Sequence, residues 1–420
     1  MDKSDLALLV AGGAAATALL ACMKGNGDES TAQLFEKRDL RMTKAVRGSS
    51  VLLSIKPKIS APLDPGFAPY ILGKQAYMAA CAAEKGQNAV RTLYVAILRQ
   101  NGLCNRLEFP VFSSSDSRFN DSLLYAFFTI MFALCQKGGF KILLCGPSDI
   151  CTEIQKEFSM QGRACYVVDL MQQVYMGSGD LQLDGSLEVI RVARNMLPDA
   201  KEDPELVGLD TDGCRLAFDL GKSDFKVTAC IGQNGKYEIT YNGEHEWDIY
   251  QTNPEYHYNI VLEKMKEAAK TMPRVDSVGG ASAGVPIKND CVWNDCFPRV
   301  SREDFKRVCV PFFKNLAKEF GDAQGNPVPL KVMNDGEVTA VAGVQMMEQQ
   351  QKGKTIGKGT FGISMGSNCG AGYMYPTNKD GMPVHPGWLN ELWTVWSALH
   401  ENKHLHSVVL CHTRPQLADI

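Results

Sequence analysis

The hydrophobic pattern changes period several times along the chain and predicts a mixture of strands and helices. In the N-terminal half, the apolar run KILLCG at 141–146, the helical stretch TEIQKEFSMQ and the run ACYVVDL at 164–170 predict a β-α-β unit with parallel strands. Upstream, RTLYVAIL predicts another strand, and FNDSLLYAFFTIMFALCQKGG predicts a long helix closed by two glycines. No phosphate-binding loop or catalytic cluster is visible in this half.

The C-terminal half contains two hairpin-like strand pairs that form an internal quasi-repeat. The first is RLAFDLGKSDFKVTACIG followed by KYEITYN, the second is TFGISMGSNCGAGYMY, and helices are predicted between them at 255–270 and 301–320. In each pair an apolar strand enters a turn of small or glycine residues. Convergent backbone N–H groups at such a bend favour phosphate oxygens, and absent side chains let the anion approach. The alternative is a plain hairpin without a ligand.

Between the two hairpins, KVMNDGEVTAVAGVQM predicts a strand that runs directly into a helix. Asp335 lies at this junction and has two interpretations. It could cap the helix, as carboxylates at helix starts commonly do. It could instead accept the proton of a substrate hydroxyl that attacks a γ-phosphate, since it is flanked in sequence by two candidate phosphate turns.

Composition describes an ordinary globular chain and limits its partners. The 420 residues are 45% hydrophobic and 22% charged, which suffices for two or three domains with sizeable cores. A net charge of −3 provides no basic footprint, so nucleic acid is not expected as a partner. The 14 cysteines lack CxxC pairs and lie mostly in apolar runs, which favours a reducing compartment without structural zinc.

Shifts in amino-acid composition along the chain predict the domain boundaries. The segment PDAKEDPELVGLDTDG, rich in acids, proline and glycine, predicts a linker. We therefore expect an apolar leader and basic linker at 1–50, a smaller α/β accessory domain at 51–205, and a further domain at 206–420.

The N-terminal leader leaves the compartment open. Leu6 to Cys22 is a run of apolar and small residues that is too short for a comfortable membrane span and is similar to a signal-peptide core. The basic stretch that follows fits a transit peptide or a solvated linker. We expect a cytoplasmic or organelle-targeted protein, with membrane anchoring through residues 6–22 as the alternative, and the leader could also lack any function.

The order of motifs in the C-terminal half resembles that of the ROK sugar kinases, which belong to the actin-like, hexokinase-like ATPase superfamily. The motifs are the D-x-G turn of FDLGKS, then GGASAGVP, the N-D pair of VMNDGEV, and SMGSNCGAGYM, and the match covers roughly residues 206–395. The resemblance implies a two-lobed actin-like ATPase core of ribonuclease H-like fold, preceded here by the α/β accessory domain. It also implies ATP and Mg²⁺ as cofactors and a small-molecule sugar as substrate.

The same resemblance assigns roles residue by residue. Asp335 would be the general base and Asn334 and Glu391 would bind the sugar. Asp219 would lie near the metal in the first phosphate turn. The remaining nucleotide contacts would come from Gly221, Lys222, Ser223, Gly366, Ser367, Gly370 and Gly372.

Four departures from the family change what we expect. Lys222 replaces a glycine of the first turn, Asn368 and Cys369 alter the second turn, and the family's zinc motif is absent. The chain ends at Ile420, where the family continues with further helices and an adenine-binding glycine motif. We therefore expect a truncated second lobe, weak ATP binding, slow turnover and self-association through an uncovered apolar face. The alternative function is a non-catalytic ROK-like sugar sensor or interaction protein.

Overall fold

The computed structural model of the chain describes most of residues 70–374 and leaves several short gaps. The described residues are 58, 70–86, 89–177, 187–201, 205–206, 212–234, 236–294, 296–321, 324–351, 360–365, 369–374 and 384–385. The chain divides into two compact units, one of residues 1–90, 112–125 and 394–420, the other of residues 91–111 and 126–393. The leader at 1–50 and Glu391 lie outside the described residues. The domain boundaries expected from the sequence stay predictions.

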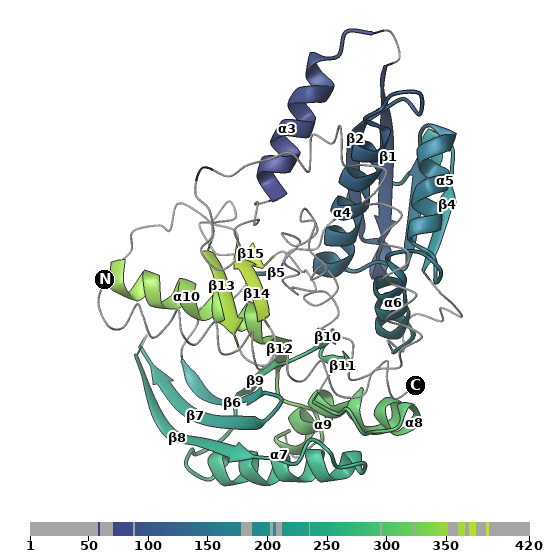
Figure 1. The fold of residues 1–420 in the computed structure, drawn as a ribbon. Coiled ribbons are helices and arrows are strands. Elements are labelled where there is room, and N and C mark those ends of the chain that lie inside the picture. The colour runs from purple at the N-terminus through teal and green to yellow at the C-terminus, as the bar shows by residue number, and fades with distance from the viewer. Residues whose placement is uncertain are drawn as a thin grey trace. The chain divides into compact units, whose positions relative to one another are not determined.

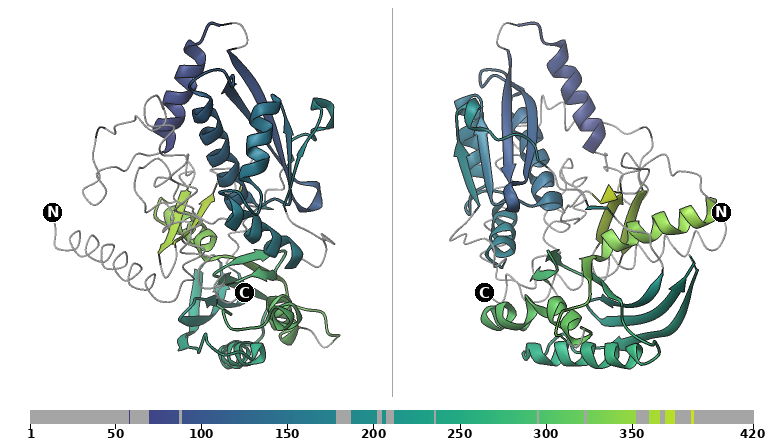
Figure 2. Two further views of the ribbon diagram at one scale, coloured as in Figure 1. Left: turned by 45° about the vertical axis from the view of Figure 1, so that its right-hand side comes forward. Right: turned by 180° about the vertical axis from the view of Figure 1, so that it is seen from behind.

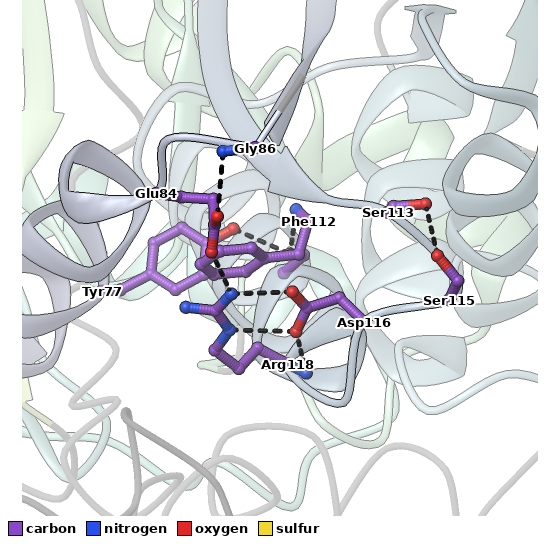
Figure 3. A network of polar contacts seen from close by, with 9 residues as sticks. Tyr77, Glu84, Gly86, Phe112, Ser113, Ser115, Asp116 and Arg118 are labelled. Atoms are coloured by element: carbon purple, nitrogen blue, oxygen red, sulfur yellow. Dashed lines mark hydrogen bonds and ion pairs between the residues drawn. The ribbon is translucent and has the colours of Figure 1, made fainter. Parts of the chain in front are cut away.

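In the first unit, helix α3 (Tyr70–Ala83) is joined to the segment 112–125 by buried polar contacts. The Tyr77 hydroxyl donates to Ser122 Oγ at 2.8 Å, and the same oxygen accepts the backbone N–H of Phe112 at 2.8 Å (Figure 3). Burial raises the pKa of Tyr77 well above its usual value. The phenol therefore stays neutral and serves as a hydrogen-bond donor inside this unit.

Arg118 binds two carboxylates of the same unit, Asp116 and Glu84 (Figure 3). Its Nε and Nη2 donate to the two carboxylate oxygens of Asp116 at 2.9 and 2.7 Å, and Nη2 also donates to Glu84 at 2.7 Å. The guanidinium lies 4.0 Å from the ring centroid of Phe112. These bonds hold the pKa of both carboxyl groups below the usual range. A planar, bidentate arginine is suited to this combination of stacking and ion pairing.

The second unit begins with a four-stranded sheet in the order β2-β1-β3-β4. Its strands are β1 (Val90–Leu98), β2 (Cys104–Phe112), β3 (Lys141–Cys145) and β4 (Glu188–Arg191). The predicted strand RTLYVAIL is confirmed as β1, and the predicted long helix is α4 (Phe119–Lys137), followed by Gly138 at φ +76°. The short 3₁₀ helices η1 (Gln100–Gly102) and η2 (Arg194–Met196) lie between strands.

The predicted β-α-β unit is only partly correct. Helix α5 (Ser148–Glu157) follows β3 as expected, but the run ACYVVDL forms helix α6 (Cys165–Gly177) and not a strand. Val167, Met171 and Val174 recur with helical spacing and are buried, so the run continues an apolar helix face beyond its predicted end. A short apolar run does not reveal its period. The strand parallel to β3 is β4, while β1 pairs antiparallel with β3, so the sheet is mixed.

A five-stranded sheet in the order β12-β9-β6-β7-β8 forms the C-terminal part of this unit (Figure 1). Strands β6, β9 and β12 are parallel, whereas β7 is antiparallel to both β6 and β8. This order and direction match the ribonuclease H-like sheet expected for an actin-like ATPase lobe. The strands are β6 (Gly213–Leu220), β7 (Asp224–Gln233), β8 (Lys236–Glu246), β9 (Ser277–Ser282) and β12 (Leu330–Asn334).

Helices cover one face of the five-stranded sheet and enclose its core. Strict alternation along β6 directs Leu216, Phe218 and Leu220 into this core and places Asp219 on the opposite face. Helices α7 (Pro254–Ala269) and α9 (Phe312–Glu319) supply the other half, and Phe218 stacks on Phe313 with ring centroids 5.6 Å apart. The connecting elements are β10 (Val285–Ile287), β11 (Asp290–Trp293), α8 (Arg302–Asp304) and a π-helical turn (Phe305–Cys309).

Two adjacent glycines on β9 provide a matched test of this packing. A Cβ at Gly280 would collide with the ring of Phe218, whereas a Cβ at Gly279 would meet nothing within 4 Å. We expect Gly280→Ala to lower the free energy of unfolding by about 1–2 kcal/mol, since overpacking forces buried rings out of their preferred positions. Gly279→Ala should leave it unchanged or raise it slightly. Denaturant titration of both variants tests the pair, and equal stabilities would contradict the packing.

The remaining described elements follow β12. Helix α10 (Asp335–Gln351) starts directly after this strand, and β13 (Thr360–Met365) pairs with β14 (Cys369–Met374) in a hairpin that lies against α10 (Figure 2). Both the strand-to-helix junction and the second hairpin were predicted from the sequence. Strand β15 (Val384–His385) pairs with β5 (Glu205–Leu206).

Among the described residues, no helix has the length and apolar character needed to cross a bilayer.

Candidate functional site

Three strands of the five-stranded sheet end at the same level, and this edge carries the candidate site. Leu220 of β6 is in register with Ser282 of β9, which is in register with Asn334 of β12. Ligands of open α/β sheets typically bind beyond the carboxyl ends of parallel strands. With strands about 4.8 Å apart, the ends of β6 and β12 lie about 10 Å from each other. The first turn and Asp335 are therefore within reach of a single small ligand.

The predicted first turn is a tight reversal between β6 and β7. The N–H of Gly221 donates to the carbonyl of Asp224 at 3.0 Å and closes the turn. A Cβ at Gly221 would come within 3.0 Å of that same carbonyl oxygen, so the position favours glycine. Ser223 is exposed and Lys222 is half-buried. The turn predicted from the sequence is thus present, while its contact with phosphate stays a prediction.

Asp219 lies at the end of β6, one residue before the reversal, on the face opposite the core. Burial raises the pKa of its carboxyl group; nearby Asp224 acts in the same direction, and Lys226, its partner in register on β7, acts against it. A half-buried carboxylate beside the predicted phosphate turn offers the hard oxygen ligands that Mg²⁺ takes. No three His, Cys, Asp or Glu side chains within the described residues form a metal-binding group. A role of Asp219 in holding a cation stays a prediction.

The raised pKa of Asp219 has a consequence for stability. Because the pKa of Asp219 is higher in the folded than in the unfolded chain, this carboxyl group favours the folded state while it is protonated. Its contribution to stability is complete at a pH below the pKa of the unfolded chain, and it is lost as the pH rises through the pKa of the folded chain. We expect Asp219→Asn to raise the melting temperature at neutral pH and to leave it unchanged in acid. A neutral-pH melting temperature below that of the parent would contradict the cost of burying this carboxylate.

The start of α10 contains a capping box, and it is not built by Asp335. The Asn334 side chain accepts the N–H of Gly336 at 2.9 Å, and the carboxylate of Glu337 accepts the N–H of Asn334 at 3.2 Å. This reciprocal pair has the pattern of a capping box, in which the N-cap residue and the third helical residue satisfy exposed donors. Asp335 shares in this capping, because its Oδ1 accepts the same N–H of Gly336 at 2.9 Å.

Asp335 is the first residue of α10 and is partly exposed. Its Oδ1 accepts the N–H of Gly336 at 2.9 Å, and its Oδ2 accepts the hydroxyl of Ser364 at 3.4 Å. Ser364 belongs to β13, which runs along α10 toward the beginning of the helix. The carboxylate thus lies between a strand end and a hairpin that leads to the predicted second turn.

A buried polar network connects the strand ends, and sequence reasoning did not find it. Asn294 donates to Ser282 Oγ at 2.9 Å and to the carbonyl of Ala283 at 2.7 Å. Asn334 donates to the carbonyl of Gly284 at 3.0 Å. Ser282, Asn294 and Asn334 are each no more than 5% exposed. The amide of Asn334, expected to bind sugar, therefore has a structural role here, and its substrate role stays a prediction.

The second turn differs in part from the prediction. Gly370 and Gly372 lie in strand β14, in register with Ser364 and Gly362, and not in the bend itself. The structure explains Gly372 by packing, because a Cβ there would come within 2.5 Å of Glu337 Cα on α10. Gly366 and Ser367, which precede β14, lie outside the described residues, as does Glu391.

Comparisons with known proteins give structural likeness only. No family model and no curated protein matches the chain. A ROK family transcriptional regulator, a homologue of the E. coli MLC protein, is 14% identical with a TM-score of 0.28, covering 39% of this chain and 37% of that one. The hexokinase of Schistosoma mansoni, complexed with glucose, is 13% identical with a TM-score of 0.31, covering 44% and 43%. An Aquifex aeolicus member of the Ppx/GppA family is 11% identical with a TM-score of 0.24, covering 41% and 51%.

The chain thus spans less than half the length of the first two structures and about half of the third. The fold assignment rests on the sheet itself. The class that the fold defines is a mixed α/β protein with a ribonuclease H-like sheet, and the site is a set of polar strand ends beside a glycine turn.

Proposed function

We propose that the protein is a ROK-like kinase that transfers a phosphoryl group from ATP to a sugar hydroxyl, with Asp335 as general base. The observation that carries the proposal is the register of the three strand ends, which brings Asp335 to the same edge of the sheet as the Gly221 turn. Asn334 and Glu337 form a capping box, so the start of the helix keeps these hydrogen bonds when the Asp335 carboxylate is changed. A carboxylate at a strand-to-helix junction, on the same sheet edge as a predicted phosphate turn, supports a role as the base that activates a hydroxyl.

The other residues have supporting roles in this proposal. The turn from Gly221 to Ser223 would hold phosphate oxygens through backbone N–H groups. Asp219 would hold Mg²⁺, which when bound neutralises charge on the phosphate oxygens. Ser364 donates a hydrogen bond to Asp335 and orients its carboxylate, so that the second carboxylate oxygen keeps one direction.

The proposal is tested by incubating the protein with ATP, Mg²⁺ and a panel of hexoses while measuring ADP release. Melting-temperature shifts with each sugar and each nucleotide are measured in parallel, since a ligand that binds only the folded state raises the transition. A kinase responds to both classes and releases ADP with at least one sugar. A shift with sugar alone and no ADP release would overturn the kinase proposal in favour of the sugar sensor.

A further inference from the structure

Two side chains that are distant from the first turn in sequence, Trp247 and Cys296, bind its carbonyl groups from the core side of the sheet. The indole Nε1–H of Trp247 donates to the carbonyl of Lys222 at 3.3 Å. The thiol of Cys296 lies 3.4 Å from the carbonyl oxygen of Gly221 and 3.8 Å from that of Leu220, within hydrogen-bond range for sulfur. Both side chains belong to the core under the sheet, where Trp247 is 6% and Cys296 0% exposed.

These contacts fix the direction of two peptide units. No cis peptide bond occurs in the described chain, and in a planar trans peptide the N–H points opposite to the C=O. A carbonyl of Lys222 that is held toward the core directs the N–H of Ser223 away from it. In the same way, the carbonyl of Gly221 directs the N–H of Lys222 outward. Successive N–H groups that point out of a turn create a site for an anion.

We propose that Trp247 and Cys296 are positioning residues of a phosphate-binding turn, and that they orient the N–H groups of Lys222 and Ser223 toward a di- or triphosphate ligand. This inference rests on the proposed function for the identity of the site but not for catalysis. It explains why an indole and a thiol, rather than plain hydrocarbon groups, lie beneath the reversal.

Each positioning residue is itself held by its surroundings. The ring of Trp247 contacts Phe225, His257 and Phe297, with centroids 5.5, 5.3 and 6.0 Å away. The backbone N–H of Cys296 donates to Asn294 Oδ1 at 2.7 Å. Because Asn294 also binds Ser282 and Ala283, the thiol is fixed relative to the end of β9. The turn is thus connected through Trp247 to the end of β8, and through Cys296 and Asn294 to the end of β9.

The test removes each donor while keeping as much packing as the chain allows. Trp247→Phe keeps an aromatic ring and removes the N–H, Cys296→Ala removes the thiol, and Cys296→Ser retains a donor. Affinities for pyrophosphate and for ATP are measured by calorimetry on the full chain. We expect Trp247→Phe and Cys296→Ala each to weaken both affinities by about 3–10-fold, in line with the net value of one hydrogen bond. Cys296→Ser should recover most of the loss.

Cys309→Ala is the matched control, because Cys309 is also 0% exposed in the same core and belongs to the π-helical turn Phe305–Cys309. It should lower the melting temperature about as much as Cys296→Ala without changing the affinity for pyrophosphate. Affinities that stay at the parent value in Trp247→Phe and Cys296→Ala would overturn the inference and leave the kinase proposal standing. A parent protein that binds neither pyrophosphate nor ATP overturns both. Binding that depends on these residues without sugar phosphorylation supports the inference and overturns only the kinase proposal.

Discussion

Replacing Asp335 with asparagine is expected to lower the rate of sugar phosphorylation at least ~10²-fold, the usual contribution of a general base. Asparagine has nearly the same shape and can still accept the N–H of Gly336, but it cannot take up a proton from the substrate hydroxyl. Because the capping box uses Asn334 and Glu337, the free energy of unfolding should change by less than about 0.5 kcal/mol. Steady-state ADP release and thermal unfolding measure the two quantities.

Glu337→Ala is the matched control for this experiment. It removes the carboxylate that accepts the N–H of Asn334 and should lower the free energy of unfolding by about 1 kcal/mol through loss of the cap. The rate of phosphorylation should fall much less than in Asp335→Asn. If Asp335→Asn instead keeps its activity and loses stability, Asp335 is structural and another group activates the hydroxyl.

Much of the five-stranded sheet could be predicted because its signals are local. Strand β6 alternates buried and more exposed residues along its whole length, and the pattern FDLGKSDF contains both strand ends and the reversal between them. The junction between β12 and α10 could also be predicted, because an apolar strand is followed there by a run of small and apolar residues. In the N-terminal half, the hydrophobic pattern wrongly predicted a strand where the chain forms α6. The reason is that an apolar run of seven residues fits a buried strand and a buried helix alike.

The candidate site was only partly predictable, for a physical reason. The residues that carry its motifs are neighbours in sequence, whereas the contacts that arrange them join distant segments. Asn294 reaches Ser282, and Trp247 reaches Lys222, across 12 and 25 positions. No local pattern reports such pairs. The capping box at α10 is the exception, because the spacing N-x-x-E of Asn334 and Glu337 was visible in the sequence.

Gly372→Ala is expected to have the largest effect on the structure around Asp335. The hairpin of β13 and β14 lies directly on the first turns of α10, and a Cβ at Gly372 would come within 2.5 Å of Glu337 Cα and 2.6 Å of the Gly336 carbonyl oxygen. These are backbone atoms of a helix and cannot move aside as a side-chain end can. The hairpin must therefore shift, at a cost of about 3 kcal/mol, the upper part of the usual range for overpacking.

Such a shift should affect function as well as stability, because Ser364 on the same hairpin donates to Asp335. We expect Gly372→Ala to lower the melting temperature and to reduce phosphorylation, and addition of ATP should not restore the parent's melting temperature. Gly279→Ala serves as the control, since it adds the same methyl group to a strand of this unit where nothing lies within 4 Å. Thermal unfolding and ADP release of both variants decide the matter. A Gly372→Ala protein as stable and as active as Gly279→Ala would show that the hairpin does not pack on α10 at this distance, and Ser364 would then have no part in orienting the base.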